Sequence, residues 1–454
     1  MSRKRRFLIN AAVLTVSGFL LRILGLWFRT VITSYIGASG MGLYQLIFSV
    51  FFLGVTACTS GFGLAMTRLA AEGKASHGCV RRCLGLALIL SGAALSALFF
   101  GADFIAANFI RSPLAARPLR ILALGLPFIA CCASLKGCFF ARRNTIVPVI
   151  GEFWEQAVTI AVSLLLLERT PLPPLESLMI GSTLGEVASV IYIVPVFLAY
   201  VRRHGLAPEN SGVTRQIVHI AGPMLAGSFL RSGLSGAENL MIPEGLRKNG
   251  ADSVAALAQY GVVQGMVMPI LFFPMSLISS AAMLLIPEIA EATAGNDHRS
   301  VSRQAEYAFR YTLLFGFPMA AIFIVFAEEL GTAFFGNPQA AVILRIMAPL
   351  APLMYVDNAV DNLLKGLDQQ MFSLKVNLVD SVSRVVLIAL LVPRFGIAAY
   401  LVILFASEIF NASLSIGRLL KFAKLRVDIL TWIVCPAVCG ALTFYLLAFL
   451  KKIF

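Results

Sequence analysis

Long apolar runs are the feature that most restricts the folds open to this sequence. A helix needs about 20 apolar residues to cross the hydrocarbon core of a bilayer, and the chain is a succession of runs of that length. Because backbone polar groups in lipid must bond internally, such runs predict helices. We expect thirteen membrane-spanning helices, at roughly 7–36, 43–71, 81–110, 118–141, 145–168, 177–201, 214–241, 254–291, 303–328, 340–365, 372–393, 396–422 and 428–450.

The composition predicts the same class of protein. Hydrophobic residues make up 59% of the 454 residues and charged residues only 13%, whereas soluble domains contain about 25% charged residues. The mean hydropathy is +0.85. We therefore expect an all-α polytopic membrane protein. The net charge of +14 lies largely in short loops, and no basic-aromatic motif is present, so a nucleic-acid partner is not expected.

The basic residues also predict the orientation. The N-terminus carries Arg3, Lys4, Arg5 and Arg6 ahead of an apolar run that is too long for a signal peptide and lacks a cleavage site. Short loops richer in Arg and Lys face the cytoplasm in bacterial membrane proteins. We expect an uncleaved first span with a cytoplasmic N-terminus, and an unpaired thirteenth helix.

The two halves of the chain resemble each other at a nearly constant spacing. Short matches recur in the same order, and a duplicated six-helix unit is the simplest account of them. The matched stretches are 42–45 with 261–264 (261−42 = 219), 119–121 with 344–346 (344−119 = 225), and Leu135-Lys136-Gly137 with Leu364-Lys365-Gly366.

Six spans is an even number, so both copies enter the membrane from the same side and form parallel repeats. We expect a six-helix lobe at 1–213, a second at 214–426 and one additional C-terminal helix at 427–454. Two-lobed transporters of this kind bind their substrate between the lobes.

Two arginines stand in the first apolar run. Arg22 and Arg29 are seven residues apart, close to two helical turns, and therefore share a helix face. Arg231 occupies the position equivalent to Arg22 in the second half (231−22 = 209). A charge at bilayer depth costs at least about 2.5–3.5 kcal/mol, so each needs water, an acid or an anionic ligand. Guanidinium grips phosphate oxygens bidentately, and we predict that the three arginines bind a diphosphate. Pairing with a neighbouring helix is the alternative, as is snorkelling of Arg29.

Carboxylates also lie within the apolar runs. The second half holds Asp357, Asp361, Asp380 and Glu408, with Arg384 one turn from Asp380, and the first half holds Glu155 and Glu186. Such residues are candidates for a proton or cation site that couples transport to a gradient. Their alternative role is to hold helices together.

Catalytic and metal motifs are missing from the sequence. There is no Walker A, GxSxG or HExxH pattern, and the eight cysteines form no CxxC pair. We expect a transporter and not an enzyme, no metal site, and no cofactor other than a coupling ion, H⁺ or Na⁺.

With these residues laid out, the chain resembles the stage V sporulation protein B branch of the polysaccharide flippases. That branch belongs to the MOP superfamily, which also holds multidrug/toxic-compound extrusion (MATE) transporters and lipid II flippases. The resemblance covers nearly the whole chain, and its matching stretches are 18–29, 36–45, 63–72, 259–274 and 286–291. It departs from the lipid II flippases at Gly54-Val55-Thr56, where they carry an arginine, and in helix number, since they usually have fourteen.

The resemblance implies a MATE-like fold in the bacterial cytoplasmic membrane. It also implies export of a polyprenyl-diphosphate-linked oligosaccharide or peptidoglycan precursor by alternating access, with Arg22 and Arg29 engaging the diphosphate. Two other functions stay open at this point. One is cation-coupled drug extrusion on the same fold, and the other is a scaffold for cell-wall or spore-coat assembly. The expected partners are a lipid-linked glycan and the bilayer, and the sequence is compatible with a monomer.

Overall fold

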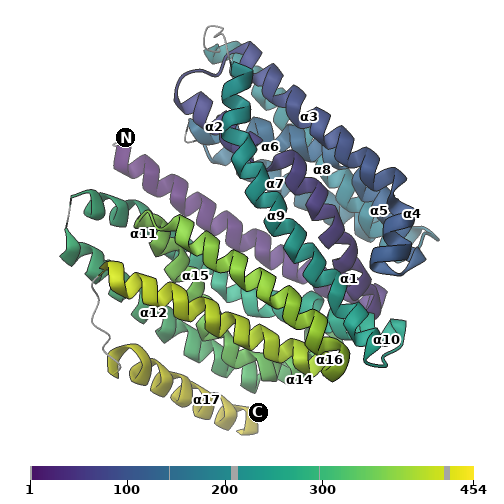
Figure 1. Ribbon diagram of the computed structural model, residues 1–454, viewed down its shortest axis with the longest axis vertical. Coiled ribbons are helices and arrows are strands. Elements are labelled where there is room, and N and C mark those ends of the chain that lie inside the picture. Colours follow the sequence, from purple (N-terminus) through teal and green to yellow (C-terminus); the bar gives the residue numbers. More distant parts are fainter. Residues whose placement is uncertain (1–2, 143, 206–212, 296, 424–429, 454) are drawn as a thin grey trace. The chain divides into compact units, whose positions relative to one another are not determined.

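The computed structural model describes residues 3–142, 144–205, 213–295, 297–423 and 430–453, and helices account for nearly all of them (Figure 1). Short π- and 3-10 segments, labelled η, interrupt the α-helices. The first half contains α1 (Arg3–Thr59), α2 (Phe62–Ala71), α3 (His77–Phe100), α4 (Ala102–Ile105), η1 (Ala106–Ile110), η2 (Pro113–Ala115), α5 (Ala116–Ala123), α6 (Leu126–Ala141), α7 (Ile146–Arg169) and α8 (Pro174–His204). The second contains α9 (Val213–Lys248), α10 (Ser253–Tyr260), η3 (Gly261–Val267), α11 (Met268–Ala294), α12 (His298–Val325), α13 (Ala327–Phe335), α14 (Pro338–Met347), η4 (Ala348–Leu350), α15 (Ala351–Gly366), α16 (Gln370–Ala423), η5 (Leu430–Val434) and α17 (Cys435–Ile453).

Two helices each contain two spans joined by a tight turn. With 57 and 54 residues, α1 and α16 are far longer than the roughly 20 residues of one crossing. Gly37 interrupts α1 at φ 66° and ψ −173°, and Gly396 interrupts α16 at φ 64° and ψ −146°. Glycine adopts this left-handed region without the steric cost that a Cβ would add. The glycines therefore allow the kink where the sequence leaves few residues for a loop.

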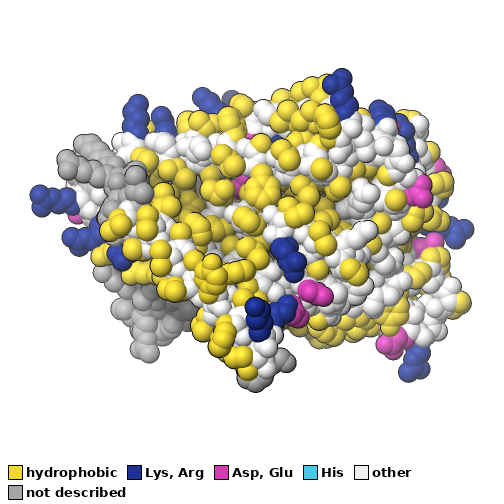
Figure 2. Space-filling model, turned by 90° about the horizontal axis from the view of Figure 1, so that it is seen from below, with side chains coloured by type: hydrophobic (Ala, Val, Ile, Leu, Met, Phe, Trp, Pro, Cys, Tyr) yellow, Lys and Arg dark blue, Asp and Glu magenta, His cyan; other side chains and the backbone are white. Residues whose placement is uncertain are grey.

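The described residues contain nine helices long and apolar enough to cross a membrane, or ten with the α5–α6 pair, which is bent by 42°. Every expected run is largely helical where the structure describes it, with short breaks such as those at 60–61 and 124–125. Large apolar side chains remain exposed on these helices; Phe100 is 80% exposed and Ile89 70%. Figure 2 shows hydrophobic side chains over much of the visible face. Exposed apolar surface on this scale is accommodated by lipid, so the expected polytopic membrane class is confirmed.

The backbone repeats itself at one spacing. The helical segment 102–110 is followed by a left-handed residue, Arg111, and α13 is followed by left-handed Gly336 (336−111 = 225). Pro113 then opens η2 and Pro338 opens α14 (338−113 = 225). The bounds of α6 and α15 also differ by 225 at both ends (351−126 and 366−141). Matching kinks at matching positions are consistent with two duplicated six-helix lobes.

This register corrects one of the sequence matches. Lys136 of α6 corresponds to Asp361 of α15 (361−136 = 225), and not to Lys365 as the shared Leu-Lys-Gly triplet indicated. Pro127 and Pro352 stand at the second residue of these two helices (352−127 = 225), so both helices begin at the same repeat position.

By its internal contacts the chain divides into two compact units. Unit 1 comprises Met1–Leu21 and Leu43–Leu240, and unit 2 comprises Arg22–Gly42 and Met241–Phe454. Unit 2 therefore contains the part of α1 that carries Arg22 and Arg29, and unit 1 contains most of α9. The lobe boundary expected between 213 and 214 remains a prediction from the repeat. The boundary expected between 426 and 427 lies outside the described residues.

Within the units, helices of neighbouring spans pack together. In unit 1, α7 packs along α8, and α6 packs against α2 and α3. In unit 2, α15 packs against α11, α12 and α16, and α17 lies along α12 (Figure 1). Apolar residues of α12, α15 and α16 form a core around Trp432, which stacks on Phe309 with ring centroids 5.0 Å apart.

Candidate functional site

Arg22 and Arg29 lie on α1 within unit 2. The side chain of Arg22 is exposed, and its Nη1 donates a long 3.5 Å hydrogen bond to the carbonyl of Phe272. Arg29 is half-buried, and its buried Nη1 has no hydrogen-bond partner in the described part of the chain. Neither arginine forms an ion pair with a described acidic residue. A buried donor without a partner costs about 1–3 kcal/mol, more when charged, so Arg29 is suited to an anionic ligand.

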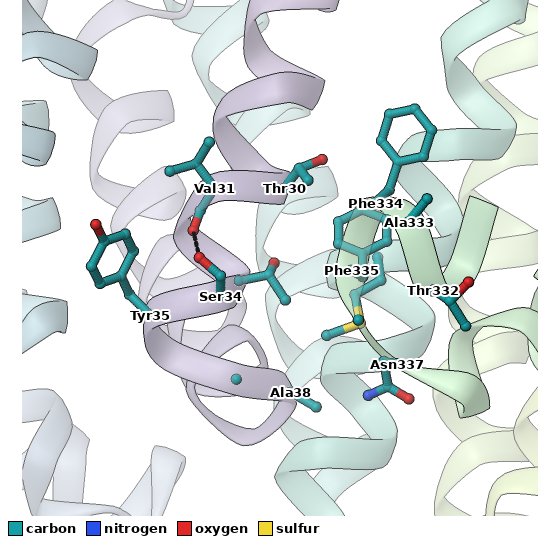
Figure 3. Close-up of a pocket in the computed structure, with 14 residues that line it drawn as sticks. Thr30, Val31, Ser34, Tyr35, Ala38, Thr332, Ala333, Phe334, Phe335 and Asn337 are labelled. Carbon is teal, nitrogen blue, oxygen red and sulfur yellow. Dashed lines mark hydrogen bonds between the residues drawn. The ribbon is translucent and has the colours of Figure 1, made fainter. Parts of the chain in front are cut away.

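A pocket begins directly after Arg29. It has a volume of about 750 Å³ and is lined by residues of α1, η3, α13 and the turn after α13. Figure 3 shows Thr30 and Ser34 of α1 on one side and Phe334, Phe335 and Asn337 on the other. Its lining residues include no Lys, Arg, Asp or Glu.

The hydroxyl groups of this pocket are oriented by their own helix. Thr33 Oγ1 donates to the carbonyl of Arg29 at 2.7 Å, and Ser34 Oγ donates to that of Val31 at 2.7 Å. Their oxygens therefore remain as acceptors toward the pocket. Asn337 Oδ1 accepts from the Gln339 amide at 2.9 Å, which leaves its NH₂ group to donate. Neutral hydroxyls and amides beside aromatic rings form a surface that can bind sugars and other polyols.

Arg231 belongs to a different unit from the other two arginines. It lies on α9 in unit 1, its side chain is exposed, and no ion pair joins it to a described residue. The next residue, Ser232, is hydrogen-bonded to Thr56 of α1 (Oγ–Oγ1 2.8 Å). The prediction that Arg22, Arg29 and Arg231 line one cavity stays a prediction.

The four carboxylates predicted in the second half come together in unit 2. Asp357 and Asp361 lie on α15, Asp380 and Glu408 lie on α16, and the four are close enough to interact electrostatically. Arg384 Nε is 3.5 Å from Asp380 Oδ2, which confirms the expected pair one turn apart. Arg384 thus acts on Asp380 and on Glu408, within a group of four carboxylates.

Polar side chains that the sequence analysis did not single out complete this cluster. Ser407 Oγ donates to Asp380 Oδ1 at 2.6 Å, Asn377 Nδ2 lies 3.5 Å from Asp361 Oδ2, and Asn411 Nδ2 donates to Asn377 Oδ1 at 2.9 Å. The two asparagines could have been identified from their spacing in the sequence, because Asn377 precedes Asp380 by three residues and Asn411 follows Glu408 by three. Helical residues three apart share a face.

Two buried oxygens of the cluster lack a hydrogen bond of normal geometry among the described residues, although the hydroxyl of Ser415 lies near Asp357. Asp357 is 9% exposed, and the buried Oδ1 atoms of Asp357 and Asp361 accept no hydrogen bond from any described residue. Buried carboxylate oxygens in this state are suited to a cation or to protonation. Described residues hold no group of three or more His, Cys, Asp or Glu side chains arranged for a metal ion, so a cation here would rely on amide, hydroxyl and water oxygens as well.

The carboxylates of the first half surround a lysine. Lys136 of α6 places its Nζ 3.8 Å from Glu152 Oε1 and 3.9 Å from Glu155 Oε2, both on α7. Glu186 of α8 interacts electrostatically with Glu155 and Lys136. Glu155 and Glu186 are coupling candidates by sequence, whereas the position of Lys136 beside these acids is seen only in the structure.

Comparison with known proteins identifies the family of this chain. A family model described as polysaccharide biosynthesis protein matches residues 7–293, which is more than half of the chain. The chain belongs to the polysaccharide biosynthesis protein family. The MatE family model also matches, over residues 248–390.

Two curated relatives of this family member come from Bacillus subtilis (strain 168). Stage V sporulation protein B is 28% identical over 410 residues, covering 86% of this chain and 79% of that protein. Sporulation protein YkvU is 20% identical over 354 residues, covering 76% of this chain and 79% of that protein.

Solved structures of the MOP superfamily share the fold. The lipid II flippase MurJ, in an inward closed conformation, matches with a TM-score of 0.71 at 13% identity, covering 97% of this chain and 99% of that chain. An inward-facing multidrug resistance MATE transporter matches with a TM-score of 0.68 at 13% identity, covering 89% and 96%. A MOP superfamily transporter from Pyrococcus furiosus Vc1 matches with a TM-score of 0.64 at 14% identity, covering 96% of each chain. The expected family resemblance and MATE-like fold are both confirmed.

Proposed function

We propose that this protein is a flippase for a polyprenyl-diphosphate-linked oligosaccharide or peptidoglycan precursor. It would move its substrate across the bacterial cytoplasmic membrane by alternating access, for polysaccharide, cell-wall or spore-cortex synthesis. The N-terminus would lie in the cytoplasm. The observation that carries the proposal is Arg29, a half-buried guanidinium with a buried Nη1 atom that no described residue satisfies.

The chemistry of unit 2 suits the two parts of such a headgroup. Arg22 and Arg29 offer permanent positive charge and forked donors to the diphosphate. The neutral pocket that begins at Thr30 offers hydroxyl, amide and aromatic surface to the sugars. A diphosphate leaving water must exchange its hydration shell for charged donors, and α1 supplies these in the two turns that precede the pocket.

Unit 2 would also supply the coupling step. We propose that Asp357, Asp361, Asp380 and Glu408 bind a proton or Na⁺ whose gradient drives the conformational cycle. Four carboxylates, one arginine and two unsatisfied Oδ1 atoms support this role. Replacing each acid in turn by its amide, and measuring transport against an imposed gradient, tests it. Unchanged gradient dependence in all four variants would remove the proposal.

A second function has its own support. The same carboxylates in unit 2, together with a MATE-like fold, suit a cation-coupled exporter of cationic drugs. The two functions differ in the charge of the transported molecule. Proteoliposomes containing the purified full chain would be given a fluorescent polyprenyl-diphosphate sugar or ethidium. Translocation of the diphosphate lipid supports the flippase, whereas ethidium transport without lipid translocation would replace it by the exporter.

A further inference from the structure

The polar clusters of the two units occupy equivalent positions of the repeat. On the neighbouring helices, Glu155 corresponds to Asp380 (380−155 = 225) and Glu186 to Glu408 (408−186 = 222). Glu152 corresponds to Asn377 with the same spacing as Glu155 and Asp380 (377−152 = 225). Acids therefore recur on α7 and α8 of unit 1 and along α16 of unit 2. The exception is α6, where Lys136 stands at the position of Asp361 on α15.

Lys136 compensates part of the negative charge of its own unit. Its side chain is only 15% exposed, and its Nζ lies within 4 Å of two carboxylates, at 3.8 and 3.9 Å. Carboxylates at membrane depth are retained when a cation compensates them. In unit 1 that cation is covalently attached to the protein and cannot leave.

Unit 2 has the opposite charge at the equivalent position. Asp361 adds a carboxylate where unit 1 has an ammonium group. Its buried Oδ1 accepts no hydrogen bond from the part of the chain that the structure describes, and the same holds for Oδ1 of the nine-tenths buried Asp357. Arg384 stands elsewhere in the repeat, at the position of Thr159 (384−159 = 225), and it compensates Asp380 and acts on Glu408, as Lys136 does on Glu155 and Glu186. The difference between the units is therefore the additional pair of carboxylates on α15, Asp357 and Asp361.

We propose that Lys136 is a built-in cation, whose ammonium group takes in unit 1 the place that a small monovalent cation takes in unit 2. Only unit 2 would then exchange its cation with solution, and a transport cycle would be coupled to one site and not to two. The unit 2 half of this inference rests on the proposed coupling function. The unit 1 half rests on the contacts of Lys136 alone.

The test is the effect of Na⁺ on thermal unfolding of the purified full chain. Asp361→Asn serves as the background, because it weakens the response of unit 2. Adding Lys136→Met to this background leaves the acids of unit 1 without their cation. We expect the melting temperature of the double variant to rise by at least about 2 °C in NaCl relative to choline chloride at equal ionic strength, because a ligand that binds only the folded state stabilises it.

Two control variants test whether the added Na⁺ response is caused by the loss of the Lys136 charge. Lys136→Arg in the same background keeps the charge and should show no added Na⁺ response. Lys365→Met removes the same charge from an exposed lysine of unit 2, bonded to Asn362 Oδ1 at 3.1 Å, and should respond to Na⁺ as the background does.

A folded Lys136→Met double variant that melts at the same temperature in both salts would overturn the inference. If that variant does not fold in choline, recovery of folded protein in NaCl supports the inference, and no recovery in either salt overturns it. Failure of Na⁺ coupling in unit 2 is separate: the wild type would then show no Na⁺ response, while the variant that combines Asp361→Asn with Lys136→Met still would.

Discussion

Replacing Arg29 by alanine should remove most of the transport and leave the protein folded. Hydrogen bonds to charged groups contribute about 1.5–3 kcal/mol each, and a guanidinium forms two with a diphosphate. If each of the two hydrogen bonds contributes about 1.5 kcal/mol, losing both costs about 3 kcal/mol, which weakens the binding of the diphosphate roughly 100-fold. The cost to folding should stay within about 0.5 kcal/mol, because Arg29 forms no ion pair and its Nη1 no hydrogen bond within the described residues.

The conservative change separates charge from geometry. Lysine keeps the positive charge but cannot form the two parallel bonds of guanidinium. Arg29→Lys should therefore retain intermediate activity, with a loss of roughly tenfold, the equivalent of about 1.4 kcal/mol.

A structural arginine provides the matched control. Arg120 forms an ion pair with Asp103 and donates from Nε to the carbonyl of Phe99 at 3.3 Å. Arg120→Ala should lower thermal stability by about 1 kcal/mol through the lost hydrogen bonds, with unchanged translocation per folded molecule.

The assay measures two quantities on the same preparations. Folded protein is quantified by its melting transition in detergent, and translocation of a fluorescent polyprenyl-diphosphate sugar is followed in proteoliposomes. Full translocation by folded Arg29→Ala would refute the substrate-binding role. A loss of folded protein matching the loss of transport would identify Arg29 as a residue that stabilises helix packing.

Three further outcomes are expected. Gly261→Ala should destabilise unit 2 by about 1–3 kcal/mol, because its Cβ would meet the carbonyl of Ala38, whereas Gly25→Ala, with open space around it, should be neutral or stabilising; equal melting temperatures would contradict this. Arg231→Ala should reduce lipid translocation without lowering folded yield, since no described residue pairs with it, and wild-type transport by this variant would exclude it from the site. The Lys451 ammonium, bonded to Glu329 at 2.6 Å, lowers the pKa of that carboxyl. The small stabilisation that wild type has over Glu329→Gln, discounted for exposure to under about 1 kcal/mol, should be present at pH 7. It should be lost as the pH falls below the ordinary glutamate pKa and through the lowered pKa of Glu329. A difference that persists in acid would show that another interaction is responsible.

The helices could be predicted from sequence because their signal is local. A run of apolar residues long enough to span a bilayer has few alternatives to a helix in lipid, so each expected run is largely helical where the structure describes it. The pair Asp380 and Arg384 was predictable for the same reason, since residues one turn apart must meet. The division into units was not predictable in this way. Assignment of Arg22 and Arg29 to unit 2, and of Arg231 to unit 1, depends on contacts between segments distant in sequence.

The role of Lys136 shows where local similarity misleads. The shared Leu-Lys-Gly triplets matched Lys136 with Lys365, and the acids of the first half then had no evident counter-charge. Pro127 and Pro352 carry the better information, because proline is tolerated in the first turn of a helix and so marks its start. Measured from these prolines, Lys136 falls nine residues into its helix, as Asp361 does (136−127 = 9; 361−352 = 9). Helix starts constrain the backbone, whereas a three-residue match between apolar helices arises readily by chance. The charge reversal between the two repeats, and with it the assignment of one cluster to a fixed cation and the other to an exchangeable one, follows from that register.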